Sequence, residues 1–169
     1  MSEKKVQVEA LTRAALALFD EAYLEAPNPR MTWFTDNEPR NGFLGTIGSL
    51  SAAEASRPLT PGDPLTVASH AAHLRFSLNL ANRAVRGENA FEGAVWARSW
   101  EVRTVGEPEW KELIAALRAE YAAFREALAS GEGWADETMM TGAFGLIAHG
   151  AWHLGAIRQG LGLVKAPAK

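Results

Sequence analysis

The four histidines of the chain form two closely spaced pairs. His149 and His153 lie four residues apart in the stretch HGAWHLGAIRQ, and His70 and His73 lie three apart in HAAH. On a helix, residues four apart point in nearly the same direction, about one turn from each other. Two such imidazoles can coordinate one metal ion, although the same pair can also pack in the core or lie on the surface.

The residues around His149 and His153 favour a metal over simple packing. Residues 139–157 contain no Asp, Glu, Lys or Arg, so the pair has no nearby charge to satisfy it. A buried polar group without a partner costs about 1 to 3 kcal/mol, and a metal ion is one possible partner. Small residues on the same face of the helix leave room for a pocket: Gly142, Ala156 and Gly160.

A third ligand is expected from the helix that carries HAAH. The apolar stripe of this helix comprises Val67, Ala71, Leu74, Leu78, Ala81 and Val85. A helical wheel places His70 about 60° from the centre of that stripe and His73 about 120° from it, so His70 flanks the core. His73 shares a second, weaker stripe with Phe76 and Leu80, which is expected to meet the long connection after the first helix or a second subunit. The predicted metal ligands are therefore His70, His149 and His153.

Three neutral imidazoles suit zinc, nickel, iron or copper and leave coordination positions open for water or substrate. The metalloprotease motif H-E-x-x-H has a glutamate general base after its first histidine, and this chain has Gly150 there. The sequence therefore does not favour a protease of that class. No Asp or Glu lies within one turn of His149 or His153, so a supporting carboxylate must come from another segment, such as Asp136 or Glu137.

Four helices are expected to position these residues, over 3–26, 64–86, 108–130 and 138–163, because apolar residues recur there at helical spacing. Pro27 ends the first. The second has Asp63 as a plausible N-cap, Pro64 in the first helical position and Gly87 just past the end. Pro108 and Gly131 bound the third.

The segments between these helices differ in what they predict. Short helical turns are expected over 44–56, because a connection as long as 27–63 is rarely bare loop. The tract 88–106 is too ambiguous to assign. The prediction is an all-α four-helix bundle in a single domain, residues 1–169.

Composition narrows the classes of function. The chain has no cysteine, which removes disulfides, thiolate metal sites and a cysteine nucleophile. A net charge of −3 over 169 residues gives no electrostatic reason to expect nucleic acid or an anionic membrane as partner. The charged N-terminus MSEKKVQVEA does not resemble a signal peptide, so a cytoplasmic protein is expected. Residues 139–157 are uncharged, but four glycines and two histidines there favour a buried helix over a membrane span.

With these residues identified, the sequence resembles the DinB/YfiT-like superfamily. The resemblance covers most of the chain and is strongest in LTVASHAAHLRFSLNLANRAVRGE and GLIAHGAWHLGAIRQGLG, while SWEVRTVGEPEWKELIAALRAEY is similar to the tract that leads into the family's third helix. It implies an up-down-down-up four-helix bundle, often dimeric, with a divalent metal held by three histidines. By motif position these are His70, His149 and His153, and the pairing HAAH allows His73 to replace or assist His70.

The function that the resemblance implies is that of a divalent-metal-binding protein. It is either a metal-dependent transferase that uses a low-molecular-weight thiol or a hydrolase, and the activated thiol or water attacks a small-molecule substrate. The alternative is a non-catalytic, stress-related dimeric protein that binds a metal or a ligand. The metal is expected to be zinc, nickel or iron. A thiol would have to be a co-substrate, because the chain has no cysteine of its own. No catalytic residue is assigned.

Overall fold

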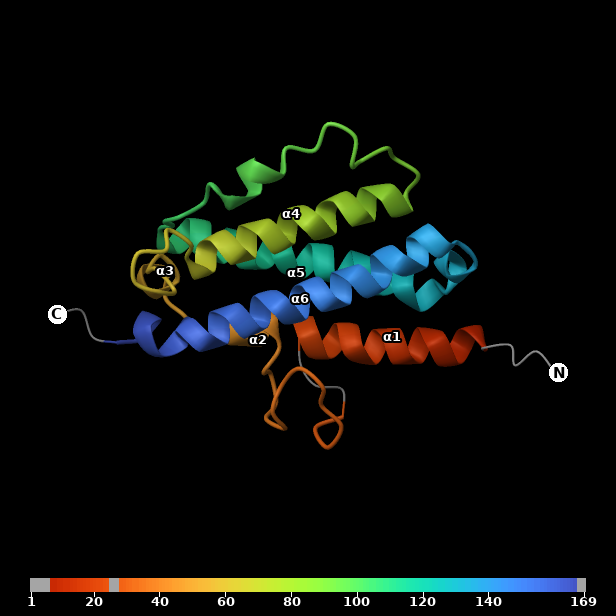
Figure 1. Ribbon diagram of the computed structural model, residues 1–169, viewed down its shortest axis with the longest axis horizontal. Helices are drawn as coiled ribbons and strands as arrows, with labels where there is room; N and C mark the ends of the chain where they lie inside the picture. The colour runs from red at the N-terminus through yellow and green to blue at the C-terminus, as the bar shows by residue number, and fades with distance from the viewer. Residues whose placement is uncertain (1–6, 25–27, 167–169) are drawn as a thin grey trace.

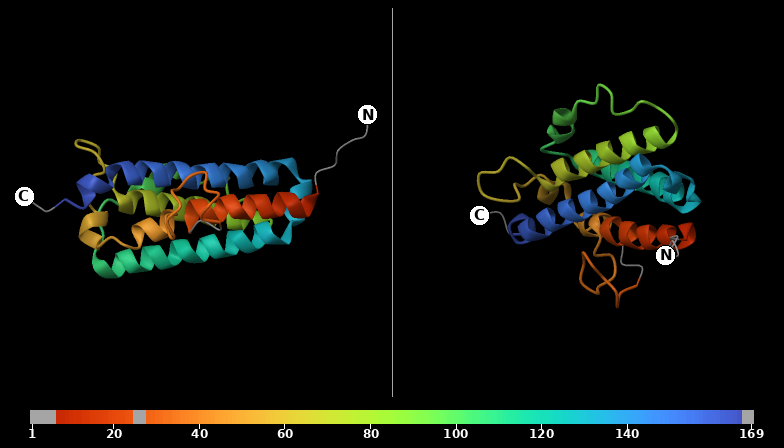
Figure 2. Two further views of the ribbon diagram at one scale, coloured as in Figure 1. Left: turned by 90° about the horizontal axis from the view of Figure 1, so that it is seen from below. Right: turned by 45° about the vertical axis from the view of Figure 1, so that its right-hand side comes forward.

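The chain folds into helices, which a computed structural model describes for residues 7–24 and 28–166 (Figure 1). The four long helices are α1 (Val8–Tyr23), α4 (Val67–Val85), α5 (Glu107–Ser130) and α6 (Glu137–Val164). Two short helices and two 3₁₀ turns complete the secondary structure: α2 (Phe43–Ile47), α3 (Ala52–Ala55), Trp96–Trp100 and Glu132–Ala135. These described residues contain no β-strand, and the long helices lie roughly along one axis in every view (Figure 2). The architecture is a helical bundle.

Each of the four predicted long helices has a counterpart in the structure. The structure extends α5 and α6 by one residue at one or both ends relative to the prediction, and Gly131 ends α5 in the left-handed conformation with φ 71°. The short helices α2 and α3 fall in the tract where helical turns were expected. Helix α1 lies inside the predicted range 3–26, whose ends and Pro27 fall outside the described residues.

The start of α4 differs from the prediction. The N-cap is Thr66 and not Asp63. The Thr66 hydroxyl accepts from the backbone N–H of Ser69, and the Ser69 hydroxyl accepts from the backbone N–H of Thr66. This reciprocal capping box satisfies two helix-end donors at once. Asp63 instead accepts from the backbone N–H of Leu65 at 2.8 Å, which makes it part of a turn before the helix.

Tyr23 of α1 packs against α6 beside the histidine pair. The Tyr23 hydroxyl donates to the backbone carbonyl of Leu146 at 3.2 Å. The Tyr23 ring also lies so close to Gly150 that a Cβ at that position would overlap it. Tyr23 therefore contacts α6 on both sides of His149 along the chain. The Tyr23 ring is held in place because it packs against Phe19 and Tyr121 in the core.

The connection between α4 and α5, residues 86–106, passes over the outer face of α4 (Figure 1). Its 3₁₀ turn Trp96–Trp100 packs on that helix. Trp96 contacts Phe76, so the second apolar stripe of α4 meets this connection of the same chain rather than the one after the first helix. Among the described helices, α6 included, none combines the length and hydropathy that a bilayer span requires.

Candidate metal centre

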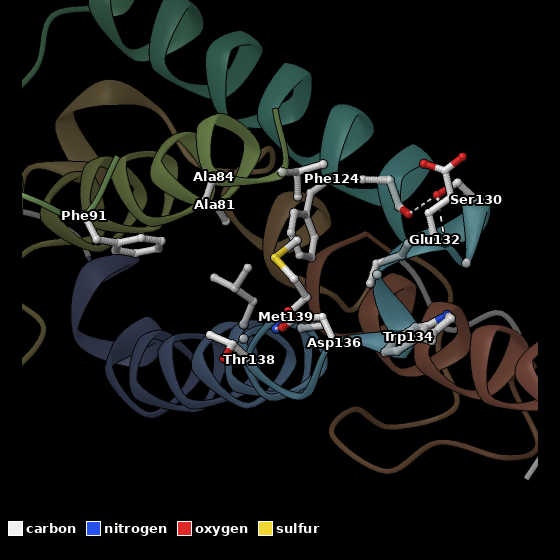
Figure 3. Close-up of a pocket in the computed structure, with 18 residues that line it drawn as sticks. Ala81, Ala84, Phe91, Phe124, Ser130, Glu132, Trp134, Asp136, Thr138 and Met139 are labelled. Carbon is white, nitrogen blue, oxygen red and sulfur yellow. Dashed lines mark hydrogen bonds between the residues drawn. The ribbon is translucent and has the colours of Figure 1, made fainter. Parts of the chain in front are cut away.

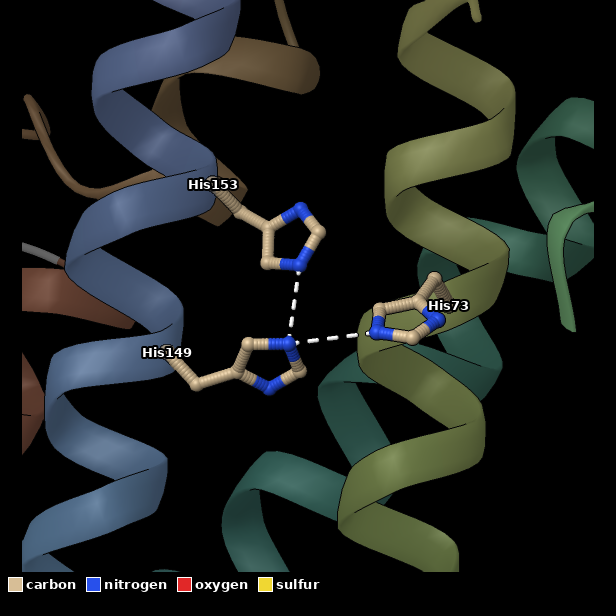
Figure 4. A group of neighbouring side chains, drawn as sticks. All are labelled: His73, His149 and His153. Carbon is tan, nitrogen blue, oxygen red and sulfur yellow. Dashed lines mark hydrogen bonds between the residues drawn. The ribbon is translucent and has the colours of Figure 1, made fainter. Parts of the chain in front are cut away.

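Three histidines bring one ring nitrogen each to a common point between α4 and α6 (Figure 4). His73 comes from α4, and His149 and His153 come from successive turns of α6. The three candidate ligand atoms all lie within 4.8 Å of one another. His153 is fully buried and His73 nearly so, while His149 is only half-buried. Solvent therefore reaches the cluster on the side of His149.

The spacing of the nitrogens is close to that of a metal site. Nε2 of His149 lies 2.9 Å from Nε2 of His153 and 3.1 Å from Nε2 of His73. Zinc–nitrogen bonds of about 2.0 to 2.1 Å at tetrahedral angles place ligand nitrogens about 3.3 Å apart. These two separations are shorter than this by about 0.4 Å or less, and the third pair of ligand atoms lies within 4.8 Å, so the side chains would have to adjust to admit an ion.

Ser99 fixes the orientation of His73. The Ser99 hydroxyl donates its proton to the backbone carbonyl of Trp96 at 2.6 Å, so towards Nδ1 of His73, 2.7 Å away, it can only accept. We therefore assign the proton of His73 to Nδ1, which leaves the lone pair on Nε2 facing the cluster. Trp100 stacks on the same imidazole, with ring centroids 4.0 Å apart and planes 20° from parallel.

His70 plays the corresponding part for His153. Their Nδ1 atoms are 2.7 Å apart, so one of the two carries the shared proton. When Nδ1 of His153 donates to Nδ1 of His70, Nε2 of His153 presents its lone pair to the cluster. Ligating histidines in metal sites are commonly oriented through the other ring nitrogen in this way. All four histidines thus belong to one hydrogen-bonded group, with His70 on its outer side.

Burial keeps these imidazoles neutral at pH 7. Loss of solvation lowers the pKa of both His70 and His73 to about 4, with neighbouring imidazoles adding to the effect at His73 and the Asp63 carboxylate opposing it at His70. Burial also lowers the pKa of His149, and at His153 burial and the three neighbouring imidazoles act together. Neutral imidazole is the form that binds a metal ion.

The structure distributes the predicted ligands differently from the helical wheel. His149 and His153 lie together as expected, the third converging nitrogen belongs to His73, and His70 contacts the far side of His153. The predicted supporting carboxylates are elsewhere: Asp136 caps the start of α6 through the N–H of Met139, and Glu137 begins that helix.

Sequence reasoning missed Ser99 and the cover that Trp96 and Trp100 give to His73. The wheel counted only the stripe that faces the bundle and therefore ranked His73 as outside the core. The available signal was the presence of two tryptophans in the unassigned tract 88–106, since large aromatic side chains need an apolar surface to cover.

Comparison of the chain with family models, with curated proteins and with solved structures found no match. What the described residues define is a helical bundle with a buried three-histidine cluster that could bind a metal ion. Any function must be argued from the chemistry of that cluster, because fold alone does not determine function.

Proposed function

We propose that the protein binds a divalent metal ion through Nε2 of His73, His149 and His153. The observation that carries this proposal is the convergence of these three nitrogens, with Nε2 of His149 2.9 and 3.1 Å from the other two. The proposal takes the alternative that HAAH allowed, in which His73 is a ligand, and assigns His70 the role of orienting His153. The metal is zinc, nickel or iron, because these ions accept neutral imidazole ligands.

The proposal also includes the DinB/YfiT-like class, with an up-down-down-up order of helices and a homodimer. The long connection between α4 and α5 supports this order, because two successive helices that run in the same direction need a crossover between them. Light scattering at several protein concentrations tests the dimer. A monomer at every concentration would contradict the proposed homodimer.

The chemistry we propose is transfer or hydrolysis on a small molecule. A bound divalent ion supplies Lewis acidity, which lowers the pKa of a water or thiol placed beside it. Around it, His149 is half-buried, so a substrate can approach from that side. Trp100 covers the imidazole of His73 with its stacked ring. The thiol would be a low-molecular-weight co-substrate, since the chain has no cysteine.

A non-catalytic role is the second candidate, and one observation favours it. Among the described residues, the hydrogen-bond partners of the three clustered imidazole rings are Ser99, His70 and one another, without a carboxylate to act as general base. An ion in such a site would link α4 to α6. This candidate keeps the stress-related binding protein as the alternative to an enzyme.

The first experiment measures metal content per chain by plasma mass spectrometry after purification without metal-affinity resin. We expect near-stoichiometric metal in the wild type, loss of metal in His73→Ala and His149→Ala, and weaker retention in His70→Ala. Loss in His70→Ala with full retention in His73→Ala would return His70 to the ligand set. A wild type that contains no metal and gains none from zinc, nickel or iron would refute the proposal.

A second experiment separates the enzyme from the binding protein. The metal-loaded chain is mixed with a low-molecular-weight thiol and 1-chloro-2,4-dinitrobenzene, and formation of the thioether is followed by absorbance. A rate that disappears with a chelator and in His149→Ala supports the transferase. If the metal-loaded wild type gives no rate with this electrophile or with a panel of esters, the non-catalytic candidate takes precedence.

A further inference from the structure

A cavity of about 510 Å³ lies between α4, α5 and α6, away from the histidine cluster (Figure 3). Ala81 and Ala84 of α4, Phe124 of α5 and Met139 of α6 line the cavity (Figure 3), and Gly142 of α6 is a further lining residue. Binding sites for small molecules in proteins are mostly apolar and have volumes of about 300 to 1,000 Å³. The cavity has the size and the lining of such a site.

Short side chains are the reason that this cavity exists. Alanine and glycine on facing sides of α4 and α6 leave the space between the two helices unfilled. Gly142, which also lines the cavity, is exposed, and a Cβ at this position would meet no other atom within 4 Å. Met139 borders the same space, and the flexible thioether side chain of methionine adapts readily to bound apolar molecules.

The charge at one end of the cavity restricts what can bind. Glu132 and Asp136 are among the lining residues at the junction of α5 and α6. None of the described residues that line the cavity is a lysine or an arginine. Both residues are exposed, and a bound anion would meet their negative charges without a lysine or arginine in the lining to compensate them.

We propose that this cavity binds an apolar small molecule that carries no negative charge. Its lining ends at Leu146, three residues before His149, so the cavity stops about one helical turn short of the histidine cluster. The inference goes beyond the metal-binding function and does not depend on it, because no histidine lines the cavity in the described residues. The cavity fits an aromatic or aliphatic compound, and it excludes carboxylates and sulfonates.

Two fluorescent probes of nearly the same shape test the proposal. N-phenyl-1-naphthylamine is uncharged, and 8-anilinonaphthalene-1-sulfonate adds a sulfonate to the same ring system. Titration of the wild-type chain should show one binding site per chain for the neutral probe. The dissociation constant of the sulfonate should be at least about tenfold higher, which corresponds to about 1.4 kcal/mol. Equal affinity of the two probes would overturn the charge restriction.

Variants that fill the cavity locate the binding site. Gly142→Phe and Ala84→Phe place a ring in the cavity from α6 and α4, and each should weaken neutral-probe binding by at least about tenfold. Gly162→Phe is the matched control, because it makes the same change in α6 at a position where a Cβ also meets nothing within 4 Å. It should bind like the wild type. Circular dichroism identifies any variant that has failed to fold.

Two results would overturn the site itself. One is wild-type affinity in both folded cavity variants, and the other is absence of neutral-probe binding to the wild type. The titration is repeated on the chelator-treated wild type and on His149→Ala, where binding of the probe should be retained. Failure of the metal proposal and failure of this one are therefore distinguishable.

Discussion

Ser99 hydrogen-bonds the imidazole of His73 and so has a direct influence on the candidate metal centre. Its hydroxyl bonds Nδ1 of His73 at 2.7 Å and holds the lone pair of Nε2 towards the other two histidines. Loss of such an orienting partner commonly lowers metal affinity by about 10- to 100-fold. We therefore predict a decrease of this size for Ser99→Ala in titration calorimetry with zinc.

Ser49→Ala is the control for that measurement. Ser49 is an exposed serine whose hydroxyl also donates to a backbone carbonyl, that of Thr46 at 2.9 Å, but it contacts no histidine. Its zinc affinity should equal that of the wild type. If Ser99→Ala binds zinc as tightly as Ser49→Ala, the hydroxyl does not orient His73.

Gly150 gives a second prediction for a single residue. A methyl group there would overlap the Tyr23 ring, whereas one at Gly155 on the same helix meets nothing within 4 Å. Gly150→Ala should lower the free energy of unfolding by about 1 to 3 kcal/mol, because α6 or Tyr23 must move. Gly155→Ala should raise it by about 0.5 to 1 kcal/mol, the usual gain from replacing a helical glycine. Urea unfolding measures both, and a Gly150→Ala chain as stable as Gly155→Ala would contradict the close packing.

Hydrogen bonds link the start of α4 to the connection that lies over the candidate metal centre. The Thr66 hydroxyl caps the helix and also donates to the backbone carbonyl of Arg103 at 3.0 Å, and the Ser69 hydroxyl donates to that of Val102 at 2.8 Å. The same two side chains therefore start α4 and hold the connection that carries Ser99 and Trp100.

Thr66→Val removes the hydroxyl and keeps the volume of the side chain. We predict a loss of about 1 to 2 kcal/mol in the free energy of unfolding, because a helix cap and a buried hydrogen bond disappear together. Ser51→Ala removes the exposed capping box of the short helix α3 and should cost less. Thermal unfolding followed by circular dichroism compares them. Equal losses would show that the bond to Arg103 contributes nothing.

The sequence predicts the long helices because each has an apolar stripe and clear end signals, such as Gly131 after α5. It does not predict the path of residues 86–106, since this connection is held by hydrogen bonds between side chain and backbone that leave no periodic pattern. Because the path of residues 86–106 was not predicted, the helical wheel favoured His70 over His73 as the third ligand. The wheel can rank a residue only against the faces whose partners are known, and the partner of the His73 face was this unassigned connection.

For the whole molecule, burial of the histidines predicts how stability depends on pH. The pKa of His70 and His73 is about 4 in the folded chain, against about 6.5 in an unfolded one. Between these values the unfolded chain binds more protons, so the free energy of unfolding rises with pH. The metal-free chain should be fully stable above pH 6.5 and should lose stability as the pH falls towards 4.

Urea unfolding at pH 7.5, 6.0 and 5.0 tests this dependence. The carboxyl groups whose pKa is lowered, those of Asp36, Glu54 and Glu88, titrate below their ordinary values and so contribute little in this range. Saturating zinc should raise the free energy of unfolding at each of these pH values, because the ion binds the folded chain. An unfolding free energy that stays constant from pH 7.5 to 5.0 would contradict the burial of neutral histidines.

The stacking of Trp100 on His73, 4.0 Å between ring centroids, has an optical consequence. A positive charge that arrives on the imidazole faces the electron-rich surface of the indole directly. Protonation of His73, or coordination of a cation by it, should therefore change the emission of Trp100. Tryptophan fluorescence would then report on metal binding or protonation at the centre. Trp100→Phe should abolish this change in emission while leaving an aromatic ring over His73.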